Sequence, residues 1–248
     1  MDAKIKNKKY FLSIIFFAII INIILFLPCA YAATPVGFTN FDVISNTTRT
    51  SSGVTMVNIS GGYIAKLNVS AYIQNLKWKA FVGWVTGKFS LDDSSGSTIY
   101  DWALTVANSR IYATRASSAI SWAGIRCANT TNLEAENLAM NQTNSKDNIT
   151  ATFSNVNHTA FSVAGVSFVQ NACNHTVNTY IDNATQSGTS YFEEVALTDI
   201  TNIVYATILE SGQKGYNSQN YDFQMIVPEN GLPTFTGATA YYMYIEIN

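Results

Sequence analysis

Short runs of alternating apolar and polar residues recur along this chain of 248 residues, and they constrain its fold more than any other feature. The run Lys79–Leu91, KAFVGWVTGKFSL, has the period of two that is typical of a strand with one buried face. Because glycines inside a strand often mark bulges, Gly83 and Gly87 predict that this strand is strongly bent. The turn-like stretch Asp92–Ser97 and the run Thr98–Thr105 then complete a predicted hairpin.

Further strand-like runs are spread over the rest of the chain, and helix is scarce. One short helix is predicted at Asn132–Met140, with Asn132 as its cap. The pattern predicts an all-β fold: a single-domain antiparallel β-sandwich over residues 33–248, with jelly-roll-like or Greek-key topology. A two-lobed sandwich divided near Asn129 is the alternative. The other predicted strands are Thr55–Ile59, Tyr63–Ile73, Arg110–Thr114, Ile120–Cys127, Phe161–Val169, Glu194–Leu197, Ile203–Leu209, Phe223–Val227 and Ala240–Ile247.

The first 32 residues have the three parts of a secretory signal peptide. Four lysines open the chain, Phe11–Leu27 is almost continuously apolar, and the small-x-small motif Ala30-Tyr31-Ala32 follows. We therefore expect residues 1–32 to be a signal peptide that is cleaved between Ala32 and Ala33. The apolar run is longer than the usual length of roughly 7–15 residues, so retention as a membrane anchor is the alternative.

The charge balance excludes some partners. Four of the 14 Lys and Arg residues and one of the 16 Asp and Glu residues lie in residues 1–32, which leaves a net charge of −5 on residues 33–248. A sparsely charged, mildly acidic chain has no basic footprint for phosphates, so nucleic acid is not expected as a partner. A membrane is expected as a partner only through the N-terminal segment, if that segment is not cleaved.

The cysteines and asparagines both point to an exported protein. Outside the signal segment only Cys127 and Cys173 remain, and an even pair in an exported chain is most simply a disulfide. Nine Asn-x-Ser/Thr triplets without a middle proline are acceptors for N-glycosylation in such a chain. Six of the nine fall in one stretch, which indicates one heavily decorated face or lobe. Their asparagines are Asn46, Asn58, Asn68, Asn129, Asn141, Asn148, Asn157, Asn174 and Asn183.

The two histidines, His158 and His175, are the middle residues of two of these triplets. A metal or catalytic role would require both rings to face one pocket beside asparagines that face solvent. The chain also lacks the Cys-x-x-Cys or His-x-x-x-His spacing of metal sites. We therefore interpret the triplet, and not the histidine, as the functional signal, and predict no metal and no cofactor.

No catalytic motif is found, so an enzyme is not expected. The stretch GVSFV at Gly165 lacks the last glycine of a nucleophile elbow. Glycoside hydrolysis needs only two carboxylates at a suitable separation, which a sequence does not reveal, so this activity stays an alternative. The acids that could supply them are Asp101, Glu193, Glu194, Asp199 and Glu210.

Two further features have a binding interpretation and a structural one. The Asp92-Asp93 turn has the oxygen density of a calcium site, but aspartate and serine are ordinary turn residues. A sugar-stacking platform is the alternative to core packing for the tryptophans, although strands that alternate this clearly favour the core. These tryptophans are Trp78, Trp84, Trp102 and Trp122.

Five aromatic motifs give the chain a resemblance to a group of exported β-rich surface proteins of archaea. The motifs are WKAFVGWVTGKFSLDDSSGSTIYDW, SRIYATR, WAGIRC, YDFQMIVPENG and YYMYIEI, which fall within Trp78–Cys127 and Tyr221–Asn248. They are core signatures, so the resemblance implies an exported β-rich fold and carries over no functional residue. Surface proteins of archaea are often glycosylated at such triplets.

The sequence thus predicts an N-glycosylated structural protein at the cell surface or outside the cell. It is expected to associate with itself or with other surface proteins and to form a coat or filament. The region Ala33–Asn58, which contains GFTNFDVI, is the predicted donor strand for a neighbour's sheet edge. The alternatives are a carbohydrate-binding or adhesin module, with glycans as partners, and a pilin-like subunit that retains its N-terminal helix.

Overall fold

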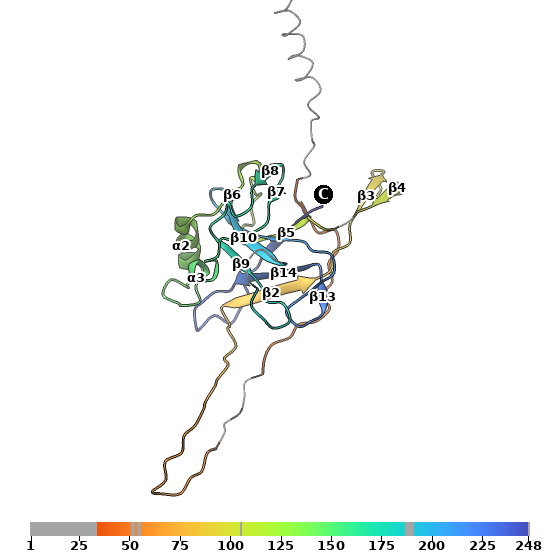
Figure 1. Cartoon of the computed structure of the whole chain (residues 1–248). Helices are drawn as coiled ribbons and strands as arrows, with labels where there is room; N and C mark the ends of the chain where they lie inside the picture. The colour runs from red at the N-terminus through yellow and green to blue at the C-terminus, as the bar shows by residue number, and fades with distance from the viewer. Residues whose placement is uncertain (1–33, 51–52, 54–55, 105, 187–190, 248) are drawn as a thin grey trace, which may run out of the picture. The chain divides into compact units, whose positions relative to one another are not determined.

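The computed structural model of the chain describes residues 34–247, apart from residues 51–52, 54–55, 105 and 187–190 (Figure 1). The predicted signal segment and the Ala32–Ala33 cleavage point lie outside the described residues. Within the part that is described, no helix has the length and apolar character needed to cross a membrane.

The centre of the fold is an antiparallel sheet that has seven strands among the described residues. Its order is β1-β15-β5-β11-β10-β6, and β9 pairs with the half of β10 that β6 leaves open. The C-terminal strand β15 therefore lies inside the sheet, between β1 and β5. The strands are β1 (Val36–Gly37), β5 (Arg110–Thr114), β6 (Arg126–Cys127), β9 (Thr176–Asn178), β10 (Glu193–Thr198), β11 (Ile203–Ile208) and β15 (Tyr242–Glu246).

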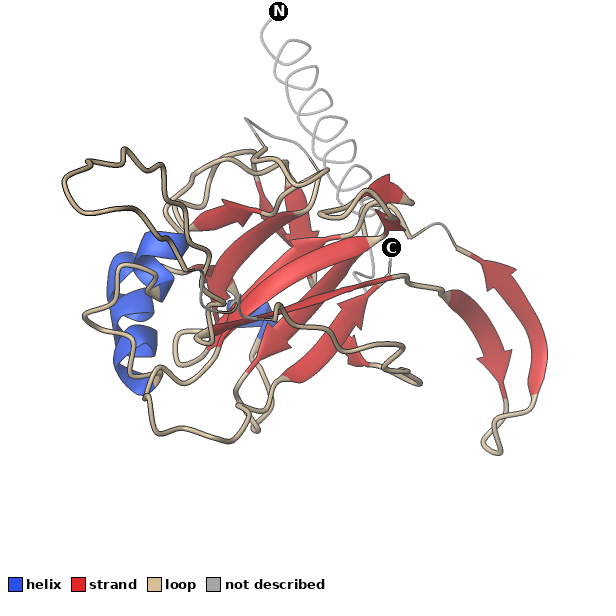
Figure 2. Cartoon of the chain, turned by 90° about the horizontal axis from the view of Figure 1, so that it is seen from below, coloured by secondary structure: helices blue, strands red, loops and turns tan. Residues whose placement is uncertain are grey.

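Both faces of this sheet are covered, because successive residues of β5, β10 and β11 contribute in turn to two apolar clusters. One face packs against β2 (Trp78–Gly83), β14 (Phe223–Pro228) and two helices, which Figure 2 shows beside the strands. The other face packs against a hairpin of β7 (Phe161–Val163) and β8 (Val166–Phe168). The predicted antiparallel all-β sandwich is confirmed. Two further short strands, β12 (Gln213–Lys214) and β13 (Asn220–Tyr221), pair with each other.

The helices are α2 (Thr130–Ala139) and the single turn α3 (Ile149–Thr152). Helix α2 begins two residues before the predicted start, and its cap is Asn129 and not Asn132. The Asn129 side chain accepts a hydrogen bond from the Asn132 N–H at 2.9 Å, and the Asn132 side chain accepts one from the Asn129 N–H at 3.0 Å. This reciprocal arrangement satisfies two N–H groups at the helix start.

The predicted bent strand at Lys79–Leu91 is two strands in two sheets. Strand β2 pairs with β14, whereas β3 (Lys88–Asp92) pairs with β4 (Thr98–Ala103) in the predicted hairpin. Gly87, between the two strands, lies close to the end of the Ile247 side chain. The predicted strand at Ile120–Cys127 is also largely wrong. It is a 3-10 turn at Trp122–Gly124 followed by the short β6.

The predicted strand at Tyr63–Ile73 and the described part of the one at Thr55–Ile59 are wrong for a different reason; Thr55 itself lies outside the described residues. Met56–Leu76, which we call the extended segment, contains neither helix nor strand and is exposed throughout (Figure 1). A turn at Ser60–Tyr63, with Gly62 at φ 84°, is its main local feature. Its period-two pattern is that of a strand, but pairing requires a neighbouring strand, and the described residues offer it none.

Candidate functional site

The nine acceptor asparagines all lie outside the core. Seven are exposed, and Asn148 and Asn157 are partly exposed. Two of them also cap helices: Asn129 caps α2, and the Asn148 side-chain oxygen accepts a hydrogen bond from the Ala151 N–H at 2.8 Å. A cap uses the amide oxygen, whereas a glycan is attached to the amide nitrogen, so capping and glycosylation are compatible at these positions.

Both ring nitrogens of His158 are engaged within the fold. Its Nε2 accepts a hydrogen bond from the Cys173 N–H at 2.9 Å, so its Nδ1 carries the proton and donates to the Thr159 carbonyl at 2.7 Å. The second histidine, His175, contacts the Phe153 carbonyl through Nδ1 at 3.0 Å and the Thr130 hydroxyl through Nε2 at 3.3 Å. These contacts leave neither ring free to bind a metal. Over the described residues, no group of three or more His, Cys, Asp or Glu side chains could hold a metal ion.

The structure joins Cys127 and Cys173, the pair expected from the sequence, with their Cα atoms 5.2 Å apart. Cys127 belongs to the edge strand β6, and Cys173 lies in the apolar cluster on the side of the β7–β8 hairpin. The disulfide therefore ties the edge of the main sheet to the segment that carries the acceptor sites Asn157 and Asn174.

Three of the five candidate carboxylates are engaged in contacts on or near the strands. Asp101 is exposed on β4, where it pairs with Lys88 at 2.9 Å. Asp199 accepts hydrogen bonds from the N–H groups of Asn202 and Thr201 and closes the β10–β11 turn. Glu193 accepts from the Thr159 N–H at 2.7 Å and from its hydroxyl at 2.9 Å.

The remaining two acids are held partly or wholly away from water. Burial, together with the charge of Glu193, raises the pKa of Glu210 to about 7. Glu194 follows Glu193 on β10, so its side chain points to the opposite face of the sheet. It is fully buried, and burial raises its pKa well above the usual value. The Ile226 N–H donates to its Oε2 at 2.8 Å, whereas its Oε1 has no hydrogen-bond partner. Glu210 thus lies close enough to Glu193 to feel its charge, whereas Glu194 lies on the other face of the sheet.

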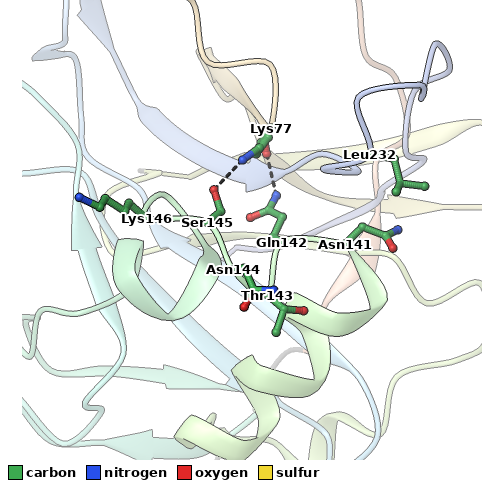
Figure 3. A pocket seen from close by; sticks show the side chains of 8 residues that line it. All are labelled: Lys77, Asn141, Gln142, Thr143, Asn144, Ser145, Lys146 and Leu232. Carbon is green, nitrogen blue, oxygen red and sulfur yellow. Dashed lines mark hydrogen bonds between the residues drawn. The ribbon is translucent and has the colours of Figure 1, made fainter.

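A surface pocket of about 590 Å³ lies where the end of α2 meets the start of β2 (Figure 3). The Gln142 Nε2 donates to the Lys77 carbonyl at 2.9 Å and to the Glu229 carbonyl at 2.8 Å, while the Lys77 Nζ donates to the Ser145 hydroxyl. These bonds pin the start of β2 to the loop after α2. The lining lacks the five candidate carboxylates and both histidines, and it consists of Lys77, Asn141, Gln142, Thr143, Asn144, Ser145, Lys146 and Leu232.

The tryptophans divide into two kinds. Trp78 and Trp122 are partly buried and pack against the two apolar clusters, as expected for the core. Trp84 and Trp102 are exposed, so the core expectation is wrong for them. Trp84 follows the end of β2, and Trp102 lies on β4, which pairs only with β3 among the described strands. Trp102 meets Tyr100 edge-on, with 4.9 Å between the ring centroids, on the β3–β4 hairpin.

The Asp92-Asp93 turn is closed by its own side chains. The Asp93 Oδ1 accepts hydrogen bonds from the Ser95 N–H at 2.9 Å, the Ser95 hydroxyl at 2.6 Å and the Ser97 N–H at 2.9 Å. Gly96, at φ 83°, completes the turn. One carboxylate oxygen of Asp93 thus forms the hairpin turn, which is the ordinary structural role of aspartate at such a position.

The predicted donor region at Ala33–Asn58 is partly occupied within its own chain. Val36 and Gly37 form β1, which pairs with Ile245 and Tyr244 of β15, and Phe38 packs against the core.

In comparisons with known proteins, the chain matches no family model, no curated protein and no solved structure.

Proposed function

We propose that this chain is an exported, N-glycosylated structural protein of the cell surface that associates with other copies of itself. The observation that carries the proposal is the large amount of apolar side chain that the fold leaves exposed. The extended segment and the β3–β4 hairpin together expose fifteen large apolar side chains that the body does not cover. Monomeric soluble domains rarely expose extensive apolar surface unless it binds a partner.

Three other features support the proposal. The N-terminal residues have the pattern of a signal peptide, the acceptor asparagines lie at the surface, and the cysteines are positioned for a disulfide. A catalytic function has no comparable support, because four of the five candidate acids and both histidines are engaged in contacts within the fold.

The first test is mass spectrometry of protein taken from its native cell surface. We expect a mature start at Ala33, a Cys127–Cys173 bond and sugar on several of the nine asparagines. Bare asparagines together with free thiols at both cysteines would contradict export and glycosylation.

The second test is the size of the native material, measured by light scattering and electron microscopy. We expect particles larger than one chain. Dispersed monomers at every concentration, including that found at the cell surface, would contradict the structural role.

A carbohydrate-binding function is the second candidate, because Tyr100 and Trp102 present adjoining exposed rings, on which a sugar could stack. In this case a Trp102→Ala variant that unfolds like the wild-type protein should lose binding on a glycan array. A wild-type protein that binds no glycan would eliminate this candidate.

A further inference from the structure

The first of two unpacked apolar surfaces is a row of side chains on the extended segment. Leu67, Val69 and Ile73 are 59%, 80% and 92% exposed, and the period of two places them on one side of an extended chain. Tyr72 belongs to the opposite side, where the Arg49 guanidinium carbon lies 4.8 Å from the centre of its ring. The side of the segment that carries Tyr72 thus has a contact within the chain. Among the described residues, no contact covers the apolar row on the other side.

The second surface is one face of the β3–β4 hairpin. Phe89 pairs with Trp102 across the strands, and Leu91 pairs with Tyr100, so these four side chains share a face. Phe89 and Trp102 are each 49% exposed, and the side chains of Leu91 and Tyr100 are more exposed than these. A lone two-stranded hairpin is marginally stable in water, so an apolar face of this kind is expected to be covered by a partner.

The two surfaces belong to opposite ends of β2. The extended segment ends at Leu76, two residues before β2, whereas the hairpin begins after it. Strand β2 is anchored to β14 over six residue pairs and is about 20 Å long. The junction before it is also held, because Asn75 donates to Asp147 at 2.8 Å and the Lys77 carbonyl accepts from Gln142. For the two surfaces to meet within one chain, the extended segment would have to reverse its direction just before this anchored junction and run back along the whole of β2.

The charges of the two surfaces are complementary. The extended segment carries Lys66 as its only charged residue, for a net charge of +1. The hairpin residues Lys88–Ala103 carry one lysine and three aspartates, for a net charge of −2. Opposite charges favour the encounter of the segment with the hairpin, and like charges disfavour hairpin against hairpin and segment against segment.

We propose that the extended segment of one copy packs its Leu67, Val69 and Ile73 row on the aromatic face of the β3–β4 hairpin of a second copy. This inference rests on the proposed function, for which it names the partner and the contact. The two contacting surfaces differ, so the contact is heterologous, and repetition of it builds an open chain or a ring of subunits. The acceptor Asn68 lies on the side of the segment away from the contact, where a glycan does not block it.

The test uses two variants of the native glycoprotein, each impaired in one surface. Val69→Asp alters the segment, and Phe89→Asp alters the hairpin. Neither residue belongs to the apolar clusters of the body, so thermal unfolding of the body should be unchanged. Gln74→Asp is the matched control, because it adds the same charge to the opposite side of the segment.

Analytical ultracentrifugation should show that the wild-type and Gln74→Asp proteins self-associate, while each impaired variant alone associates about tenfold or more weakly. An equal mixture of the two variants should form heterodimers and no larger species, since one intact segment meets one intact hairpin. Native mass spectrometry with one isotope-labelled variant identifies these heterodimers.

Three results would overturn the inference. The first is that the Val69→Asp variant assembles as the wild-type protein does. The second is that the Phe89→Asp variant self-associates through its segment alone. The third is that the mixture of the two variants stays monomeric. If the wild-type particles persist in these cases, the proposed function stands with a different contact. The proposed function itself fails if the native wild-type protein is monomeric or unglycosylated.

Discussion

Glu194 shows at the scale of one residue how this fold constrains chemistry. Its carboxyl group is fully buried, its pKa is raised by burial, and the phenol of Tyr205 nearby in the same core also lacks a hydrogen-bond partner. A carboxyl group is ionised in the unfolded chain above a pH of about 4.3, whereas burial keeps this one protonated to a higher pH in the fold. Glu194 therefore makes folding less favourable as the pH rises from about 4 through its folded pKa.

Replacing Glu194 with glutamine should remove this pH dependence, because an amide does not ionise in either state. We expect Glu194→Gln to raise the free energy of unfolding at pH 7.5, relative to the change at pH 4, by about 1 kcal/mol or more. Urea unfolding at both pH values measures the difference. The exposed control Glu134→Gln should show little difference, and an equal effect of Glu194→Gln at both pH values would contradict a buried neutral acid.

Some residue-level features of the site could be predicted from the sequence, and others could not. The acceptor asparagines are local triplets, and the Cys127–Cys173 pair follows from having two cysteines outside the predicted signal segment. The protonation of Glu194 depends on what packs against β10, and that is β14, some 30 residues further along the chain. The sequence signal for a buried acid was the pair of adjacent glutamates, Glu193 and Glu194, inside a strand with both faces buried.

At the scale of elements, helix α2 begins at a residue with two predicted roles. Asn129 caps the helix and is also an acceptor asparagine. We expect Asn129→Ala to destabilise the protein by about 1 kcal/mol, whereas Thr131→Ala abolishes the acceptor triplet and keeps the cap. Urea unfolding of both variants, with mass analysis at this site, separates the two roles. Equal destabilisation by both would show that the glycan, and not the cap, stabilises this region.

Strands β5, β10, β11 and β14 could be predicted because their apolar runs reflect burial in the same chain. The extended segment carries an equally good strand pattern and forms no strand. Strand formation depends on a partner that is distant in the sequence, so a local pattern indicates the capacity to pair and not the presence of a neighbour. The same limit explains why Lys79–Leu91 was expected to be one strand: a local alternation does not reveal that its halves join different sheets.

For the molecule as a whole, the disulfide is expected to be a main source of stability. It closes a loop with a sequence separation of 46 residues across the part of the chain that is rich in acceptor triplets. The double variant Cys127→Ser/Cys173→Ser should lose about 4 kcal/mol in the free energy of unfolding, on the chain-entropy model. Wild-type protein unfolded in reductant should match the variant. A loss below about 1 kcal/mol would mean that the reduced unfolded chain is already compact.

The place of Thr176 in the sheet has a consequence for the timing of modification. Asn174 is exposed, but Thr176, the third residue of its triplet, is fully buried on β9 and donates its hydroxyl to the Asn157 carbonyl at 3.2 Å. An enzyme that recognises the triplet must reach this hydroxyl, so it can act on Asn174 only before β9 joins β10. The triplet at Asn68 stays open after folding. If the chain is glycosylated as proposed, the ratio of sugar on Asn174 to sugar on Asn68 compares the rate at which the sheet closes with the rate of the modifying enzyme.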